Sequence, residues 1–226
     1  MNLDFNDPAV QAAIIVVAIM LLVAFPVHEF AHAMAAFRLG DGTAKMFGRL
    51  TLNPVAHFDP YGGSILALTF ILSAGSFGFG WAKPTPVNPL NLDGGHRGEA
   101  VVAAAGPLSN LILAIAAAIP LRYLNANQEL LIQLPLLEQV LSQFVVINLI
   151  LMVFNFIPIP PLDGSKVLFA FLDPRTAYQV RPFLEQYGML ILLALVLSSF
   201  ILPGPSILGR IISPIVSGLY GVLVGG

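Results

Sequence analysis

The chain has 226 residues, of which 57% are hydrophobic and only 10% carry a charge. Soluble domains contain about 25% charged residues, so this composition is typical of a protein that lies in a lipid bilayer. The net charge of −2 comes without a basic patch and gives no indication of a nucleic-acid partner. Cysteine is absent, which excludes disulfides and thiolate metal sites, so a metal ion would have to be bound by histidines and carboxylates.

Hydrophobic runs along the chain predict an all-α, polytopic membrane protein. A helix that crosses a bilayer takes about 20 apolar residues. Six segments come near this length, and the first, third and fourth satisfy it best: 10–37, 63–80, 99–121, 139–157, 187–203 and 206–224. Because no repeat and no added soluble domain is visible, we expect one membrane-embedded domain over residues 1–226.

The first hydrophobic segment contains the sequence His28-Glu29-Phe30-Ala31-His32. Ionisable groups are costly at membrane depth and indicate a functional site. Histidines four residues apart project from one face of a helix and can bind the same metal ion. Glu29 lies about 100° around the helix from His28, beside such an ion. This arrangement predicts a general base next to a metal-bound water, as in metal-dependent peptide hydrolysis.

A catalytic zinc site needs a third protein ligand besides the two histidines. The motif that supplies it in many soluble metalloproteases is missing, since Ala35 and Arg38 occupy its glycine and third-histidine positions. The remaining candidates for a third ligand are Asp163, His57, Asp59, Asp93 and His96.

Asp163 has the best sequence context of these candidates. Three prolines in the four residues 158–161 end the preceding apolar helix at membrane depth. Gly164 allows a tight bend, so that the carboxylate can turn inward. Asn155, on the last turns of the helix over 139–157, offers an amide to a substrate carbonyl or an oxyanion.

The segment 63–80 decides on which side of the membrane the two halves of this site emerge. A complete crossing would place His32 and Asp163 at opposite faces, so we predict a re-entrant segment, which also fits the glycines in 75–80. Eight of the ten basic residues then share one side, which the positive-inside rule makes cytosolic. These eight are Arg38, Lys45, Arg49, Lys83, Arg97, Lys166, Arg175 and Arg181, with Arg122 and Arg210 on the other side.

The region 38–98 is an insertion rich in glycine and proline. Loose alternation over 45–52 predicts a strand, a small β element on the cytosolic side that could hold an unwound substrate by β-addition. We expect His57 and Asp59 to stabilise a turn, with a contact to a ligand histidine as the alternative. Asn110 is expected to join helices through its amide rather than to act in catalysis.

At these motifs the chain resembles the site-2 protease family of intramembrane zinc metalloproteases (peptidase family M50), over roughly residues 10–170. The motifs are HEFAH at 28–32, NPVAHFDPYGG at 53–63, GWAKPTPVNP at 80–89, AGPLSN at 105–110 and NFIPIPPLDG at 155–164. The resemblance implies that His28, His32 and Asp163 bind one zinc ion. It also implies that Glu29 is the catalytic base and that Asn155 contacts the substrate or the transition state.

The resemblance further implies a core of three helices, 10–37, 99–121 and 139–165, with peripheral helices at 187–203 and 206–224 that gate substrate entry. PDZ and CBS domains, which familiar members carry, are not found in the sequence. The implied activity is cleavage of a peptide bond within or near a transmembrane helix of a membrane-protein substrate. We expect this in a prokaryotic plasma membrane, with the site towards the cytosol and with room for a regulatory membrane partner.

Two other functional classes stay open at this point. A transporter or channel also has ionisable residues and broken helices inside the membrane, although no inverted repeat is visible here. A catalytically inactive relative would bind helices without cutting them and would not need Glu29. The sequence predicts neither the substrate nor the oligomeric state.

Overall fold

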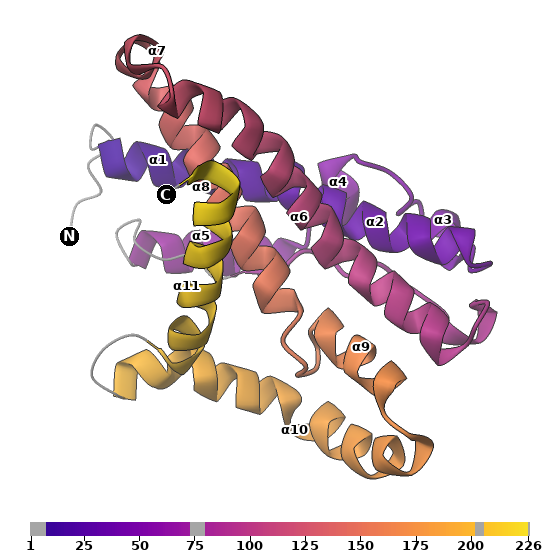
Figure 1. Cartoon of the computed structure of the whole chain (residues 1–226). Coiled ribbons are helices and arrows are strands. Elements are labelled where there is room, and N and C mark those ends of the chain that lie inside the picture. The colour runs from indigo at the N-terminus through magenta and orange to yellow at the C-terminus, as the bar shows by residue number, and fades with distance from the viewer. Residues whose placement is uncertain (1–7, 73–79, 202–205, 226) are drawn as a thin grey trace.

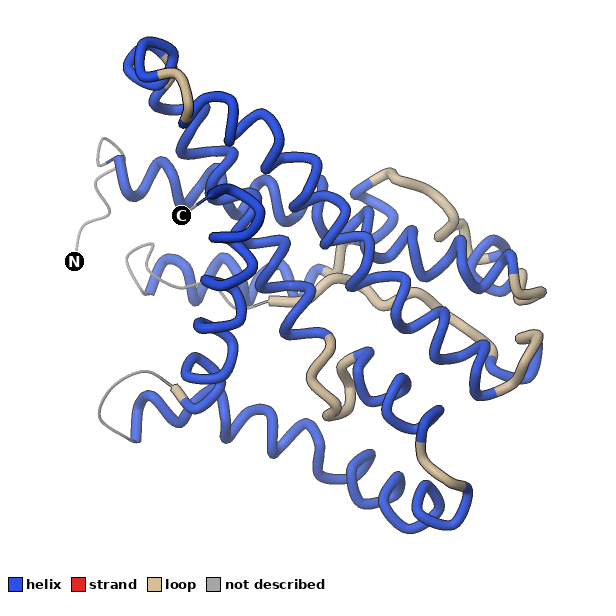
Figure 2. Tube along the Cα trace, viewed as in Figure 1, coloured by secondary structure: helices blue, strands red, loops and turns tan. Residues whose placement is uncertain are grey.

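A computed structural model of the chain describes residues 8–72, 80–201 and 206–225. Within these ranges every regular element is a helix and no strand occurs (Figures 1 and 2). Five helical stretches in them are long and apolar enough to cross a membrane: Val17–Arg38, His96–Asn125, Pro135–Asn155, Arg175–Ser198 and Ile207–Gly225. The all-α prediction is therefore confirmed, and five of the six predicted segments correspond to such a stretch.

The first hydrophobic segment forms one nearly continuous rod of three pieces: α1 (Pro8–Ile19), the π-turn η1 (Met20–Ala24) and α2 (Phe25–Arg38). The π-turn ends two residues before Pro26, which has no N–H to donate to the carbonyl of Leu22. A wider turn is a common way for a helix to absorb such a break. The rod thereby continues past the proline and carries both motif histidines on α2.

The predicted strand over 45–52 is wrong. Its first residues belong to the short helix α3 (Thr43–Met46). Asp41 stabilises the start of this helix, because its Oδ1 accepts a hydrogen bond of 3.0 Å from the main-chain N–H of Thr43. Gly48, with a φ of +68°, turns the chain just after the helix. These local caps outweigh the loose alternation in the sequence, and the small β element does not exist in the described part of the insertion.

The rest of the insertion contains α4 (Pro54–His57), α5 (Pro60–Leu72) and a 3-10 turn, η2 (Pro89–Asn91). Residues 80–88 have no regular structure and run as an open chain, seen in tan in Figure 2. The chain at Gly80 lies against the start of α5, since a Cβ on Gly80 would be 2.5 Å from the carbonyl oxygen of Gly62. Of the predicted re-entrant segment, residues 73–79 lie outside the described residues.

Helix α6 (His96–Asn125) occupies the centre of the molecule and packs against α2, α8 and α9. The helices that follow it are α7 (Gln128–Gln133), α8 (Pro135–Asn155) and α9 (Asp163–Phe171). Small side chains on one face of α6 let α8 approach closely. The main apolar core lies there and comprises Ala114, Ala117, Ala118, Leu121, Val145, Leu149 and Met152, with Val216 and Val224 from the C-terminal helix.

The C-terminal part consists of α10 (Pro174–Ile201), α11 (Ile207–Tyr220) and the π-turn η3 (Gly221–Gly225). Helix α10 begins well before residue 187, where its hydrophobic run begins, because its first turns are polar and hydropathy alone does not reveal them. Helix α10 packs against α11, and a Cβ on Gly188 would lie 2.5 Å from the carbonyl oxygen of Pro160. This helix therefore also touches the loop between α8 and α9.

The termini of three core elements meet at one end of the molecule. In Figure 1 the end of α2 and the start of α6 lie next to each other on the right, and the turn between α9 and α10 also lies towards that end. The end of α2 and the start of α6 are joined by a hydrogen bond of 2.7 Å from Asp93 N to the carbonyl oxygen of Leu39. The expected metal ligands lie on α2 and at the first residue of α9.

Candidate metal centre

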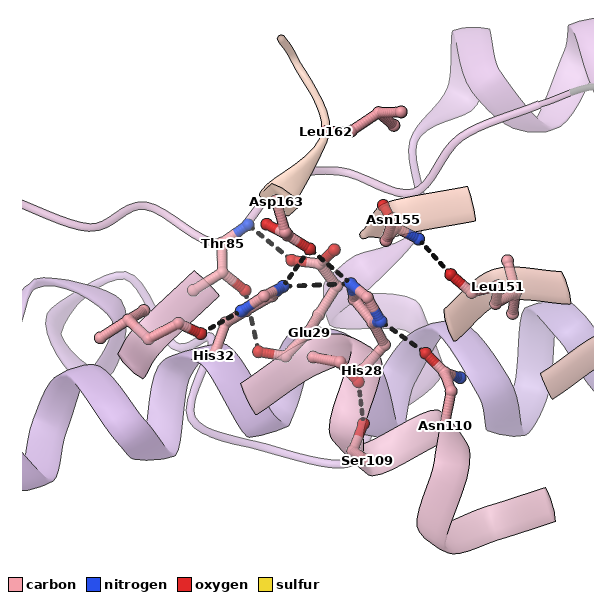
Figure 3. A network of polar contacts seen from close by, with 12 residues as sticks. His28, Glu29, His32, Thr85, Ser109, Asn110, Leu151, Asn155, Leu162 and Asp163 are labelled. Carbon is pink, nitrogen blue, oxygen red and sulfur yellow. Dashed lines mark hydrogen bonds and ion pairs between the residues drawn. The ribbon is translucent and has the colours of Figure 1, made fainter. Parts of the chain in front are cut away.

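The three predicted metal ligands come together between α2 and the first residue of α9 (Figure 3). Oδ2 of Asp163 lies 3.3 Å from Nε2 of His28 and 3.1 Å from Nε2 of His32. The two Nε2 atoms lie 3.0 Å apart. All three residues are buried, and their ligand atoms lie within 4.8 Å of one another. Residues up to 135 positions apart in the chain thus present three donor atoms to one point.

The remaining ring nitrogen of each histidine is held by helix α6. Nδ1 of His28 lies 2.6 Å from Oδ1 of Asn110, and Nδ1 of His32 lies 2.7 Å from the carbonyl oxygen of Val102. Both oxygens can only accept, so both Nδ1 atoms donate a hydrogen. Each neutral imidazole then carries its free lone pair on Nε2, the atom that faces Asp163.

These donor atoms fit a divalent cation. Three acceptors, two imidazole lone pairs and a carboxylate oxygen, converge at about 3 Å, an arrangement that is repulsive without a positive charge between them. A proton on one Nε2 would satisfy only part of these contacts, whereas a cation satisfies all three. Two histidines and one carboxylate are a donor set of catalytic zinc sites, in which a fourth position stays open for water or substrate.

Glycine at position 106 lets α6 pass directly beside the donor atoms. A Cβ on Gly106 would lie 2.3 Å from Nε2 of His32 and 2.6 Å from Nε2 of His28. Val102, Gly106 and Asn110 follow one another at intervals of four, and so lie on one face of α6 opposite the two histidines. Neither Val102 nor Gly106 was predicted from the sequence, although the AGPLSN motif contains Gly106.

Asn110 belongs to a buried chain of amides that connects three helices. Its Nδ2 donates to Oδ1 of Asn148 on α8 at 2.9 Å, and Nδ2 of Asn148 donates to the carbonyl oxygen of Phe144 at 2.9 Å. Both asparagines are 0% exposed. The expectation that Asn110 joins helices agrees with these contacts, but the residue also orients a candidate ligand. Asn148 was missed, and its one sequence signal is its position seven residues before Asn155.

Asp163 reaches the centre because α9 begins very close to the end of α8. A Cβ on Gly164 would lie 2.3 Å from the carbonyl oxygen of Phe156, so a larger residue would push α9 away. Gly164 is not among the glycines with positive φ. Its role is therefore close backbone approach rather than the tight bend that the sequence suggested.

Glu29 lies beside the three donor atoms and is held by the open chain over 80–88 (Figure 3). Its Oε2 accepts a hydrogen bond of 2.7 Å from the main-chain N–H of Thr85. The hydroxyl of Thr85 donates to the main-chain carbonyl oxygen of Glu29 at 3.0 Å. Thr85 was not singled out from the sequence, where nothing but its place in the GWAKPTPVNP motif draws attention to it.

Asn155 stands on the last turn of α8, and Figure 3 shows it on the same side of α2 as Asp163. Its Nδ2 donates to the carbonyl oxygen of Leu151 in its own helix at 2.9 Å. The amide group has a second N–H, so this bond leaves one hydrogen for another partner. Its predicted role towards the substrate remains a prediction.

The other candidates for the third ligand lie elsewhere, and none joins the group of His28 in the part of the chain that the structure describes. His57 is buried and bonds through Nε2 to the carbonyl oxygen of Thr51 at 2.8 Å. Asp59 caps the start of α5, since its Oδ1 accepts from the N–H groups of Tyr61 and Gly62. Both residues thus stabilise the local chain, as expected.

The buried His/His/Asp group lies beside the carboxylate of Glu29, and both histidines stand on a helix that can span a membrane. This arrangement is typical of a metal-dependent hydrolase site. The model of peptidase family M50 matches residues 128–199. A Bacillus subtilis protein named "Putative zinc metalloprotease YwhC" is 40% identical over 179 residues, which are 78% of each chain. The chain therefore belongs to peptidase family M50. With five apolar helices in its described residues, it is an integral membrane protein of the site-2 protease type.

Two mycobacterial relatives carry the same description under the name Rip2. The one from Mycobacterium tuberculosis is 32% identical over 196 residues, which cover 85% of this chain and 71% of the relative. The one from Mycolicibacterium smegmatis is 30% identical over 184 residues, which cover 78% of this chain and 64% of the relative. No solved structure matches the chain. The names of these relatives support a zinc-dependent peptidase.

Proposed function

We propose that the protein is an intramembrane zinc metalloendopeptidase that cleaves a membrane-protein substrate within or near a transmembrane helix. The observation that carries the proposal is the convergence of His28, His32 and Asp163 next to Glu29. One zinc ion would be held by the two Nε2 atoms and Oδ2. When bound, zinc polarises a carbonyl group and lowers the pKa of water at its open position.

Glu29 is proposed to move the proton of the reaction. It takes a hydrogen from the attacking water and delivers it to the nitrogen of the departing amine. Its Oε2 is bonded to Thr85 N, which leaves Oε1 to exchange the proton. Asn155 is proposed to bind the substrate carbonyl or the developing oxyanion through its second amide hydrogen. The burial of the donor residues keeps bulk water from the site, so the substrate must bring a locally unwound segment to it.

We also propose that the site opens towards the cytosol in a prokaryotic plasma membrane. The distribution of basic residues supports this orientation. The re-entrant course of 63–80 remains part of this proposal on the sequence argument, and Gly80 lies close to Gly62. The predicted β-addition of substrate to 45–52 is wrong, because residues 45–46 belong to α3 and Gly48 turns the chain just after it.

The test is a cleavage assay with purified protein in liposomes that contain a single-span substrate. Wild type should cut the substrate in a zinc-dependent manner, and Glu29→Gln should stop the cutting while zinc stays bound. Asp163→Ala should lower the bound zinc. Glu129→Gln, a matched change on α7 far along the chain, should leave both unchanged.

The same preparation separates the competing functions. Zinc flux into the liposomes without cleavage would support a transporter and contradict the protease. Binding of the substrate by wild type without cleavage, at full zinc occupancy, would support the inactive helix-binding relative. A full zinc content in Asp163→Ala would mean that another carboxylate completes the site.

A further inference from the structure

We infer that Thr85 is a positioning residue for Glu29, and that the open chain over 80–88, called the strap below, is part of the active site. This inference rests on the proposed proteolytic function. It starts from the two hydrogen bonds between Thr85 and Glu29, one to the carboxylate and one to the main-chain carbonyl. They join residues 56 positions apart in the chain.

The strap is fixed to the insertion and to the end of α2 on both sides of Thr85. Before it, Lys83 N donates to the carbonyl oxygen of His57 at 2.9 Å. After it, Asn88 N donates to Oδ2 of the buried Asp41 at 2.7 Å. Because main-chain N–H groups of the strap donate both bonds, these two anchors do not depend on the side chains of the strap itself. These two anchors hold Thr85 at a fixed position along the axis of α2.

The two residues that flank Thr85 cannot donate a main-chain hydrogen bond. Pro84 and Pro86 have no main-chain N–H, so Thr85 is the one residue of these three that can donate from the backbone. Pro86 also disfavours the helical conformation at Thr85 and keeps the strap extended. The sequence Pro-Thr-Pro therefore directs a single N–H, together with a hydroxyl, at Glu29.

The consequence for Glu29 is a defined carboxylate orientation. A free glutamate side chain populates several rotamers, and selecting one of them costs free energy at each turnover. The bond to Thr85 N selects one orientation in advance and engages Oε2. An error of about 1 Å in the placement of a catalytic group can cost about 100-fold in rate. Loss of this positioning should therefore lower the rate of the chemical step and change substrate binding little.

Two alternative roles of the strap, a latch or a purely structural element, predict different results. If the strap were a latch that blocks Glu29, loosening it would raise activity. If the strap only stabilised the fold, loosening it would lower the thermal unfolding midpoint without changing kcat in folded, zinc-loaded protein. Positioning predicts a lower kcat with an unchanged KM and an unchanged zinc content.

The kinetic experiment compares Thr85→Val, Thr85→Ser and Thr51→Val in liposomes. Valine keeps the shape of threonine and its main-chain N–H, but it removes the hydroxyl bond that anchors Thr85 to the main chain of α2. Without this anchor the bond from Thr85 N to Oε2 of Glu29 should loosen, whereas serine keeps the anchor. Thr51→Val is the matched control, since Oγ1 of Thr51 accepts from Asn53 N in an exposed loop of the same insertion. We expect kcat to fall about 10-fold in Thr85→Val, with KM within about twofold, and Thr85→Ser and Thr51→Val to behave as wild type.

A second readout does not depend on activity. Because Pro84 and Pro86 lack an amide hydrogen, hydrogen exchange in the stretch 84–86 reports Thr85 N–H alone. This hydrogen should be protected in wild type and should exchange at least about 10-fold faster in Glu29→Ala, which removes its acceptor. Lys83 N–H serves as the internal reference, since its acceptor is unaffected.

Each result has a definite meaning. A higher kcat in Thr85→Val would overturn positioning in favour of a latch, and an unchanged kcat would overturn it in favour of a structural role. Rapid exchange of Thr85 N–H in wild type would remove the contact on which the inference depends. If zinc-loaded wild type cuts nothing, the proposed function and this inference fall together, whereas a cutting wild type with an equally active Thr85→Val contradicts this inference alone.

Discussion

Nδ1 of His28 on α2 and Oδ1 of Asn110 on α6 lie 2.6 Å apart in the buried interior. This contact fixes the tautomer of the imidazole and points its Nε2 at Asp163. Loss of a partner of this kind typically lowers metal affinity or activity about 10- to 100-fold. The candidate site is therefore not complete with three donor residues, because α6 supplies the groups that orient two of them.

Replacement of Asn110 tests this orienting role. Asn110→Ala removes the acceptor of His28 Nδ1 and should weaken zinc binding about 10- to 100-fold. Competition with a chelator of known affinity measures the change. Asn127→Ala, in the exposed turn just after the same helix, should bind zinc as wild type does. Equal affinities in the two variants would contradict the role of Asn110.

Gly106→Ala should prevent zinc binding for steric reasons. The new methyl group would stand 2.3 Å and 2.6 Å from the two Nε2 atoms, which is closer than non-bonded atoms approach, and would occupy space on the side of α6. Metal analysis of purified protein should find most of the zinc lost. Gly218→Ala on α11 is the matched control, because a Cβ there meets nothing within 4 Å. Full zinc occupancy in Gly106→Ala would mean that α6 can move away from the site.

Asp41 should make the stability of the insertion sensitive to acid. Burial alone would raise the pKa of Asp41, but hydrogen bonds from Thr43, Asn88 and Asn91 outweigh it and hold the pKa below the usual range. The stabilisation is therefore complete above the unfolded pKa of about 3.9 and is lost as the pH falls through the lower folded pKa.

The measurement for Asp41 is the thermal unfolding midpoint at pH 7 and at pH 3, in wild type and in Asp41→Asn. The variant should be less stable by about 1–2 kcal/mol at pH 7, because amide contacts replace charge-assisted ones. Its unfolding midpoint should also fall less than that of wild type when the pH is lowered from 7 to 3. If the midpoint falls equally in the two proteins, other carboxylates account for the acid sensitivity.

Asn155→Ala tests the proposed contact with the substrate. If the second amide hydrogen binds the oxyanion, kcat should fall about 100-fold while zinc content stays the same. Gln143→Ala, an exposed change on the same helix, should leave kcat unchanged. A loss of zinc or of folded protein in Asn155→Ala would instead assign the residue to the packing of α8, where it already bonds to Leu151.

Local patterns predicted a large part of the fold. The apolar runs located the helices that can span a membrane, and the proline cluster over 158–161 located the end of α8. The same reasoning missed the polar first turns of α10 and placed a strand where α3 lies. Hydropathy does not reveal a polar, exposed helix such as the start of α10. The weak alternation over 45–52 does not determine the local structure, because Asp41 and Gly48 cap a helix there.

The sequence by itself determined that His28, Glu29 and His32 share a helix at defined angles, since the pitch of an α-helix depends only on local geometry. Tertiary structure alone decided which groups meet them. Thr85, Val102, Gly106, Asn110 and Asn148 reach the site only because α6 packs between α2 and α8 and because the strap returns along α2. Contacts of this kind depend on how helices distant in sequence pack together, and no local pattern encodes that packing.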